Sequence, residues 1–328
     1  MGKTIFIALL ALSAAVQAAP AYVASPYKYL PLHNDAAGNV ISVAPDGKPV
    51  PYAQLPGAGA LTWAFAVGEC GSETWGGKPA SAVAQANVPA FAKAGIGYII
   101  STGGQGAIFT CGSKEGMDAF VARYDSPQLI GFDFDIEAGQ TPAQIRSLME
   151  NIVYAQGRHP RLRFSFTIAT HAASDGSKRS LNKTAELVLA EVRRSGLRDY
   201  VVNLMVMDYG PASKKVCVLG KDRRCDMGAS ALQAARNVHE KYKLPYAQIE
   251  LTPMIGVNDV IENVFTLEDA AVMVEGVRKL GMAGVHFWSI DRDLPCTKPA
   301  TGAEALCSTM PDVPAGAYTR ALTKDAAR

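Results

Sequence analysis

The sequence predicts an α/β fold in a single domain, a (β/α)8 barrel, on three observations. Short apolar runs typical of strands alternate with helical patterns along most of the 328 residues. Such alternation favours a parallel sheet whose strands are joined by helices. The number of units approaches the eight that close a TIM barrel, and no linker or internal repeat interrupts them. An open doubly wound sheet is the alternative fold.

The strands are expected where a short apolar run is flanked by turn residues, at 61–67, 98–102, 129–136, 163–169, 201–207, 249–255 and 284–290. A weaker first strand is expected within residues 28–32. Helical patterns lie between these runs, at 80–94, 114–124, 141–156, 181–195, 228–243 and 266–280, with one more near 315–326. Thr141 followed by Pro142 is typical of a helix start, because a Thr can cap the helix and Pro fits its first turn.

The chain divides into three parts. Residues 1–18 have the features of a signal peptide: Lys3 supplies a positive start, an apolar stretch follows, and small residues end it. Residues 19–60 form an N-terminal segment without a clear helix, which can include the first barrel strand. Residues 61–328 form the barrel. The alternative doubly wound fold would need a glycine-rich phosphate turn, but Phe109 stands where its third glycine belongs.

Composition limits the partners and the location. The apolar stretch of the signal peptide is shorter than the about 20 residues that span a bilayer, so we expect a secreted protein, extracellular or periplasmic, with no membrane partner. An uncleaved membrane anchor is the alternative. The formal net charge is +2 and no basic patch is present, so no nucleic-acid partner is expected. We expect a monomer.

An even number of cysteines in an exported chain indicates disulfides: Cys70, Cys111, Cys217, Cys225, Cys296 and Cys307. Fifteen pairings are possible on paper. The local pairs Cys217–Cys225 and Cys296–Cys307 each join residues of one loop, which leaves Cys70–Cys111. No Cys-x-x-Cys occurs and no His spacing completes a zinc site, so neither a metal nor a cofactor is expected.

The most informative segment is residues 129–137, Leu-Ile-Gly-Phe-Asp-Phe-Asp-Ile-Glu. Side chains alternate along a strand, so its apolar residues share one face and Asp133, Asp135 and Glu137 share the other. In a barrel strand the acids would point inward, with Glu137 at the carboxyl-end mouth where barrel enzymes place their chemistry. Stacked carboxylates cannot all ionise easily, so one pKa rises and that group can act as a general acid.

Two other interpretations of this segment are open. A calcium loop also starts Asp-x-Asp, but it needs Gly at its sixth place and Glu at its twelfth, where this chain has Ala138 and Gln144. A solvent-exposed acidic edge strand is the second alternative. The central place of the segment in the strand order argues against an edge.

The segment resembles the Asp-x-Asp-x-Glu signature of family 18 glycoside hydrolases, the chitinases and their relatives. Three further runs agree in order: Ser101-Thr102-Gly103-Gly104, Met205-Val206-Met207-Asp208-Tyr209-Gly210 and Phe287-Trp288-Ser289. They resemble the family's Ser-x-Gly-Gly, its sixth-strand motif that supplies a Tyr, and its eighth-strand Trp. There are departures, since Ile130 stands where many members have another Asp and Gly210 follows Tyr209 where Asp is common.

The resemblance implies a chitinase that cleaves β-1,4 links in chitin or chito-oligosaccharides by a retaining, substrate-assisted mechanism. Glu137 would be the general acid and base, and Asp135 would orient the acetamido group while sharing a proton with Asp133. The hydroxyl of Tyr209 would hold the acetamido oxygen, and Trp288 would floor the sugar pocket.

The resemblance also implies four further substrate-binding residues: Asp208, Met205, Met207 and Gly104. Asp208 can instead make a structural hydrogen bond, and the two Met residues can simply fill the barrel. Two other functions are open: an endo-β-N-acetylglucosaminidase acting on N-glycans, and a chitin-binding lectin on a catalytically weak barrel.

Overall fold

The computed structural model describes residues 21–32, 38–45 and 47–324. Their central feature is a closed barrel of eight parallel strands, which confirms the predicted fold. In barrel order the strands are β1 (Val23–Tyr29), β4 (Leu61–Ala66), β8 (Tyr98–Gly103), β10 (Leu129–Asp135), β11 (Arg163–Ala169), β12 (Tyr200–Met205), β13 (Ile249–Thr252) and β16 (Gly284–Phe287). The signal peptide predicted at 1–18 lies outside the described residues.

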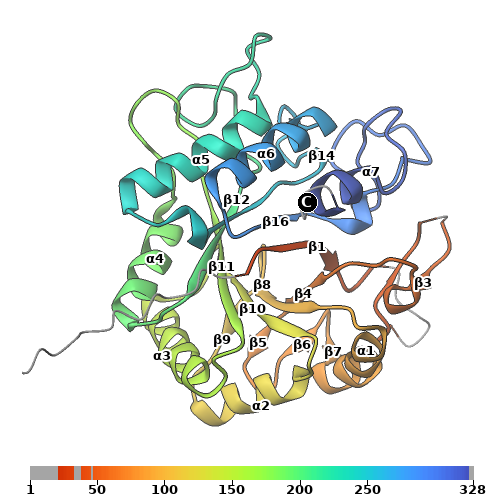
Figure 1. The fold of residues 1–328 in the computed structure, drawn as a ribbon, viewed down its shortest axis with the longest axis vertical. Helices are drawn as coiled ribbons and strands as arrows, with labels where there is room; N and C mark the ends of the chain where they lie inside the picture. Colours follow the sequence, from red (N-terminus) through yellow and green to blue (C-terminus); the bar gives the residue numbers. More distant parts are fainter. Residues whose placement is uncertain (1–20, 33–37, 46, 325–328) are drawn as a thin grey trace, which may run out of the picture.

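Six helices surround the strands as an arc (Figure 1): α1 (Ala80–Ala94), α2 (Lys114–Tyr124), α3 (Pro142–Arg158), α4 (Lys183–Ser195), α5 (Met227–Tyr242) and α6 (Leu267–Leu280). The predicted start of α3 is correct. Thr141 and Gln144 form a capping box, and Pro142 is the first residue of the helix. The last expected helix is short: α7 (Ala317–Thr319) continues into one π-helical turn, η4 (Arg320–Lys324). No described helix is long and apolar enough to cross a membrane.

The first strand differs from the prediction. It begins at Val23 and ends at Tyr29, whereas it was expected within 28–32. Pro26 and the buried Lys28 lie inside it, so its apolar pattern is broken. The described residues 38–60 hold no α-helix. They form a hairpin of β2 (Ser42–Val43) and β3 (Val50–Pro51), followed by a 3-10 turn, η1 (Tyr52–Gln54). In Figure 1, β3 lies between α7 and α1.

Small paired strands decorate the barrel loops. β5 (Gly68–Glu69) pairs with β9 (Phe109–Thr110), β6 (Thr74–Trp75) with β7 (Lys78–Pro79), and β14 (Gly256–Val257) with β15 (Val264–Phe265). Two further 3-10 turns are η2 (Tyr246–Gln248) and η3 (Ile290–Arg292). The loops after β4, β8 and β13 are therefore ordered by local pairing rather than by side chains alone.

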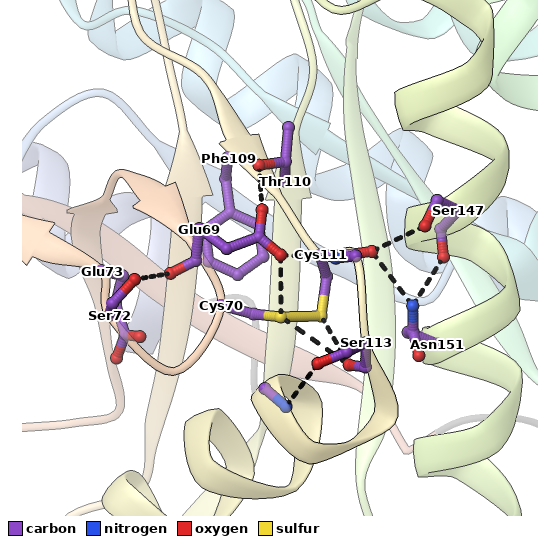
Figure 2. Close-up of a disulfide and its surroundings, with 12 residues drawn as sticks. Glu69, Cys70, Ser72, Glu73, Phe109, Thr110, Cys111, Ser113, Ser147 and Asn151 are labelled. Carbon is purple, nitrogen blue, oxygen red and sulfur yellow. Dashed lines mark hydrogen bonds between the residues drawn. A yellow bond between two sulfur atoms is a disulfide. The ribbon is translucent and has the colours of Figure 1, made fainter.

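All six cysteines form disulfides, and the three predicted pairings are correct. Cys70–Cys111 joins the residues that follow β5 and β9, so it closes the small sheet between the first two helical units (Figure 2). The carbonyl oxygen of Cys111 also accepts hydrogen bonds from Ser147 Oγ and Asn151 Nδ2 of α3, each at 3.0 Å. The disulfide loop is thereby attached to a barrel helix.

The outward face of β10 packs as expected. Phe132 and Phe134 are buried, with ring centroids 4.8 Å from Phe120 of α2 and 5.7 Å from Phe166 of β11 respectively. Such aromatic packing holds β10 against the helix α2 and the neighbouring strand β11. Asp133 and Asp135 therefore face the barrel interior, and Glu137 follows just after the strand.

Candidate active site

A cavity of about 360 Å³ opens at the carboxyl ends of the barrel strands. Each barrel strand, or the residues directly after it, contributes to its wall. Its size lies within the range of small-ligand sites, and its position is where (β/α)8 barrels bind substrates. Asp135 and Glu137 belong to this wall, whereas Asp133 lies deeper in the barrel.

Asp133 is buried and accepts four hydrogen bonds from hydroxyl groups. Tyr27 and Ser101 donate to Oδ2 at 2.9 and 2.7 Å. Ser165 and Thr167 donate to Oδ1 at 2.7 and 2.8 Å. The strand register explains this set, since Ser101 of β8 and Ser165 of β11 are the cross-strand neighbours of Asp133. Burial raises the pKa of Asp133, and the four hydroxyl donors oppose that rise.

The hydroxyls around Asp133 belong to a wider polar network inside the barrel. Asn203 of β12 donates from Nδ2 to Tyr27 and to Thr167, each at 2.9 Å. Thr252 of β13 donates to Asn203 Oδ1 at 2.7 Å. The network therefore crosses from β1 to β13 beneath the cavity. Buried networks in which every group is paired hold their members in fixed positions.

Asp135 is buried without such support. Its cross-strand neighbours are Gly103, which has no side chain, and Thr167, whose hydroxyl donates to Asp133. Its Oδ1 has no hydrogen-bond partner among the described residues. Burial, followed by the charges of Glu137 and Asp133, raises the pKa of Asp135 well above its usual range. The neutral, protonated form of Asp135 therefore persists to higher pH than it does for an exposed Asp.

Glu137 follows the end of β10 and reaches the cavity wall while partly buried. Burial raises the pKa of Glu137, and the Asp208 carboxylate raises it further. Asp208 has a positive φ of 49° and accepts a hydrogen bond from the Val260 N–H at 2.8 Å. Burial also raises the pKa of Asp208. Two carboxyl groups on different strands therefore share this part of the cavity, which makes proton donation by Glu137 possible at higher pH.

Trp288 forms an aromatic wall of the cavity. It follows β16, and its ring stacks on Phe65 at 5.6 Å between centroids with an interplanar angle of 15°. Tyr27 and Tyr29 of β1 lie at 6.2 and 6.0 Å from the same ring. Aromatic faces of this kind bind the apolar face of a ring-shaped ligand.

Comparison with known proteins identifies the relatives of this barrel. A curated protein of Escherichia coli (strain K12), "Probable bifunctional chitinase/lysozyme", is 29% identical over 231 residues, which are 63% of this chain and 24% of that protein. This chain spans less than half the length of the curated relatives that it matches. No protein-family model matches the chain.

Two solved structures cover nearly the whole chain. The catalytic domain of the hyperthermophilic chitinase from Pyrococcus furiosus has a TM-score of 0.70 and 26% identity, over 94% of this chain and 96% of that one. In sequence and fold the chain is therefore similar to chitinases, as its resemblance to glycoside hydrolase family 18 predicted. Catalytic-site mutants of active domain 2 of the P. furiosus chitinase, complexed with chito-oligosaccharides, give a TM-score of 0.69 and 25% identity, over 93% of this chain and 94% of that one.

The sixth-strand family 18 motif does not place all its residues as expected. Met205, Met207 and Asp208 line the cavity, and their contact with substrate stays a prediction. Tyr209 does not line it. Its side chain is buried in the core, its N–H donates to Asn263 Oδ1 at 2.7 Å, and burial raises the pKa of its phenol. The predicted contact between the Tyr209 hydroxyl and a sugar therefore has no support from its position.

Gly104 of the family 18 Ser-x-Gly-Gly run shapes the wall without lining it. Its φ is +83°, and a Cβ there would come within 2.8 Å of the Phe65 ring. Its N–H donates to the carbonyl oxygen of Asp135 at 3.2 Å. Gly104 therefore lets Phe65 approach β8 closely, which supports the stacking of Phe65 on Trp288.

Several cavity residues were missed by sequence analysis. Tyr27 and Phe65 are the clearest cases, followed by Gln105, His171 and Met254. The signal for Tyr27 was available in principle, because Ser25 and Tyr27 alternate with Pro26 and Lys28 as a strand requires. That strand has few apolar residues, so its sequence pattern did not predict a strand that includes Tyr27.

One group among the described residues has the spacing of metal ligands: Glu69, Cys70 and Cys111. Both cysteine sulfurs are engaged in a disulfide (Figure 2), so neither is a thiolate that could bind a metal. The group therefore does not fit a metal centre.

Proposed function

We propose that the protein is a secreted chitinase that hydrolyses β-1,4 links between N-acetylglucosamine units of chitin or chito-oligosaccharides. The observation that carries the proposal is the ordered stack on β10. Asp133 is held by four hydroxyls, Asp135 above it is buried with an unpartnered oxygen, and Glu137 reaches the cavity. The chito-oligosaccharide complexes of a structural relative support the substrate class.

Glu137 would act first as the general acid. It would donate its proton to the glycosidic oxygen, so that the link to the leaving sugar breaks without releasing an alkoxide. Burial and Asp208 keep the pKa of Glu137 raised, so the protonated form persists to higher pH than for an exposed Glu. General acid catalysis of this kind contributes on the order of 10²- to 10⁴-fold to a rate.

The nucleophile would come from the substrate. The carbonyl oxygen of the N-acetyl group attacks the anomeric carbon of its own sugar, forming a cyclic oxazolinium ion as the glycosidic bond breaks. This route is a recognised exception to the two-carboxylate scheme. Because the attack is intramolecular, its effective concentration is high. Glu137, now ionised, then takes a proton from water as the water opens the ring, and the β configuration is retained.

Asp135 and Asp133 would manage the charge of the acetamido group. Asp135 would accept a hydrogen bond from the acetamido N–H and offset the positive charge of the oxazolinium ion as it passes its own proton toward Asp133. Burial raises the pKa of Asp133 against the opposing effect of its four hydroxyl donors, so it can receive that proton. Trp288 and Phe65 would support the pyranose ring from below.

The location also belongs to the proposal. The three disulfides are typical of an oxidising compartment. Together with the expected signal peptide they support export to the periplasm or the medium.

The decisive experiment compares two substrates and a test of binding to chitin. Purified protein is incubated with a chito-oligosaccharide series and, separately, with an N-glycosylated protein, and the products are identified by mass. We expect shortened chito-oligosaccharides whose first-formed anomer, read by NMR, is β. Release of glycans from the glycoprotein with intact chito-oligosaccharides would favour the endo-β-N-acetylglucosaminidase. Binding of chitin without any product would favour the lectin.

A further inference from the structure

A buried ion pair lies at the seam where the barrel closes. Lys28 of β1 and Asp291 of η3 approach to 2.7 Å, and neither side chain is accessible to solvent. Neither residue belongs to the wall of the catalytic cavity. The proposed reaction does not use them, so the pair needs another explanation.

The pair joins the backbone of two segments. Lys28 Nζ also donates to the carbonyl oxygens of Tyr29 at 2.7 Å and Leu32 at 2.6 Å. The other oxygen of Asp291 accepts from the Tyr29 N–H at 3.1 Å. Through these bonds the last residue of β1 is attached to the turn that follows β16.

Those two segments carry the aromatic wall. Tyr27 and Tyr29 lie on β1, and Trp288 lies three residues before Asp291. The backbone of Trp288 is held on its other side, because its N–H donates to Pro253 O at 2.8 Å and its carbonyl accepts from Ile255 N–H at 3.0 Å. The ion pair supplies the hold on the β1 side.

We propose that Lys28 and Asp291 are positioning residues that fix Trp288 as the sugar-binding wall of the cavity, with Tyr29 packed beside it. They act through the end of β1 and the η3 turn and touch no substrate. The part of this inference that concerns sugar binding rests on the proposed function. The part that concerns the order of Trp288 does not.

Stability alone is a weak reason for such a pair. Taking two charges out of water is costly, and apolar residues of similar volume often replace a buried pair without loss of stability. A pair that also forms three hydrogen bonds to the backbone of residues 29–32 instead selects one arrangement of that segment against the η3 turn. Removing one partner alone leaves a buried charge uncompensated, so single and double variants behave differently.

The test uses three variants of the full chain and one control. Asp291→Asn removes the charge and keeps a hydrogen-bonding side chain, and Lys28→Met removes the ammonium. The double variant Lys28→Met/Asp291→Leu leaves no unpaired charge, so it keeps the test valid where Lys28→Met does not fold. The control is Glu250→Gln, which breaks the buried ion pair between Arg163 and Glu250 at the amino-terminal end of the barrel.

The first readout is acrylamide quenching of tryptophan fluorescence without ligand. Trp63 and Trp75 are 0% and 1% exposed, so quenching reports mainly on Trp288. We expect the quenching constant to rise about twofold or more in Asp291→Asn and in the double variant, and to stay unchanged in Glu250→Gln. An unchanged constant in both folded variants of the pair would overturn the proposal.

The second readout is the split between KM and kcat on chito-oligosaccharides. We expect KM to rise about tenfold, a loss of about 1.4 kcal/mol of binding, with kcat changed less. Glu250→Gln should lower thermal stability and leave KM unchanged. Equal kinetic effects in the control and in the pair variants would show a general structural role and overturn the proposal. If the wild type turns over no chito-oligosaccharide, the proposed function fails, but the quenching result still decides the positioning role.

Discussion

Asp133 and Asp135 lie two positions apart on β10, but their surroundings favour different protonation states. Four hydroxyls point at Asp133, whereas Oδ1 of Asp135 has no partner among the described residues. Hydrogen bonds to a carboxylate favour its charged form, and burial without them favours the neutral form. The arrangement therefore keeps one proton close to Asp135, where the proposed reaction needs it.

The residue-scale prediction concerns Asp208 and the pH profile. After burial, the Asp208 charge is the cause that raises the pKa of Glu137. Asp208→Asn keeps an oxygen for the Val260 N–H but removes that charge, so the pKa of Glu137 falls. Because a general acid works only while protonated, we expect the alkaline limb of the kcat/KM profile to move to lower pH.

The matched control for this prediction is Asp259→Asn. Asp259 also lines the cavity, but it is exposed and is not among the causes of the Glu137 shift. Its substitution should leave the alkaline limb in place. An alkaline limb that does not move in Asp208→Asn would contradict the assignment of Glu137 as the acid.

At the scale of elements, the loop closed by Cys70–Cys111 is the largest covalent constraint. The two cysteines are 41 positions apart, compared with 8 for Cys217–Cys225. A cross-link removes more entropy from the unfolded chain when it closes a longer loop. The same disulfide anchors the loops after β4 and β8 to α3 (Figure 2).

We therefore expect unequal losses on removing these disulfides. The loop-entropy relation gives a loss of about 4 kcal/mol for Cys70→Ser/Cys111→Ser and about 2.5 kcal/mol for Cys217→Ser/Cys225→Ser. Urea unfolding of both double variants measures the two free energies. A larger loss for the shorter loop would show that native contacts, rather than loop closure, decide the contribution.

The elements also show what the sequence could predict. The seven barrel strands after β1 follow from alternation or apolar runs, because each buries its outward face under a helix. The predicted position of β1 was too late in the chain, because Pro26 and Lys28 break its apolar pattern. Lys28 is buried with the distant Asp291 as its counter-charge, which the sequence does not show.

The positions of the three acids follow from the strand period, whereas the position of Tyr209 does not. Asp133, Asp135 and Glu137 keep the alternation of β10. In the sixth-strand motif, β12 ends at Met205 and Asp208 has a positive φ, so Tyr209 turns into the core. The four hydroxyl donors to Asp133 come from three other strands, and their register is not visible in one sequence.

At the scale of the whole molecule, the acids near the two ends of the barrel have pKa values shifted in opposite directions. Burial raises the pKa of Asp133, Asp135 and Glu137 toward the carboxyl end. Burial also acts to raise the pKa of Glu250 nearer the amino end, but Arg163 and His286 outweigh it and hold that pKa at about 2. Both groups of acids therefore link folding to pH, with opposite signs.

The signs give a stability optimum on the acidic side of neutrality. Carboxyl groups whose pKa is raised by folding bind protons more tightly in the folded protein. They therefore destabilise the folded protein as pH rises above about 4, which is their pKa in the unfolded chain. The contribution of Glu250 is present above that value and is lost as pH falls toward 2. We expect Asp135→Asn to be more stable than the wild type at pH 8, with a smaller change between pH 5 and pH 8.

Urea unfolding at both pH values measures this difference, and Glu250→Gln serves as the comparison. Glu250→Gln should lose stability at pH 5 and pH 8 alike, since its charge is present at both. An Asp135→Asn variant that is less stable than the wild type at pH 8 would show that the buried Asp135 carboxyl does not destabilise the folded protein.

The central claim, that Glu137 at the cavity lends a proton to a sugar linkage, is tested most directly by the turnover of Glu137→Gln. The rate on chito-oligosaccharides is compared with that of the wild type and of Glu262→Gln, an exposed glutamate in the loop after β13. We predict a loss of kcat on the order of 10³-fold or more for Glu137→Gln, with the fold and sugar binding retained, and no loss for Glu262→Gln. A Glu137→Gln protein that turns over chito-oligosaccharides at the wild-type rate would contradict the account.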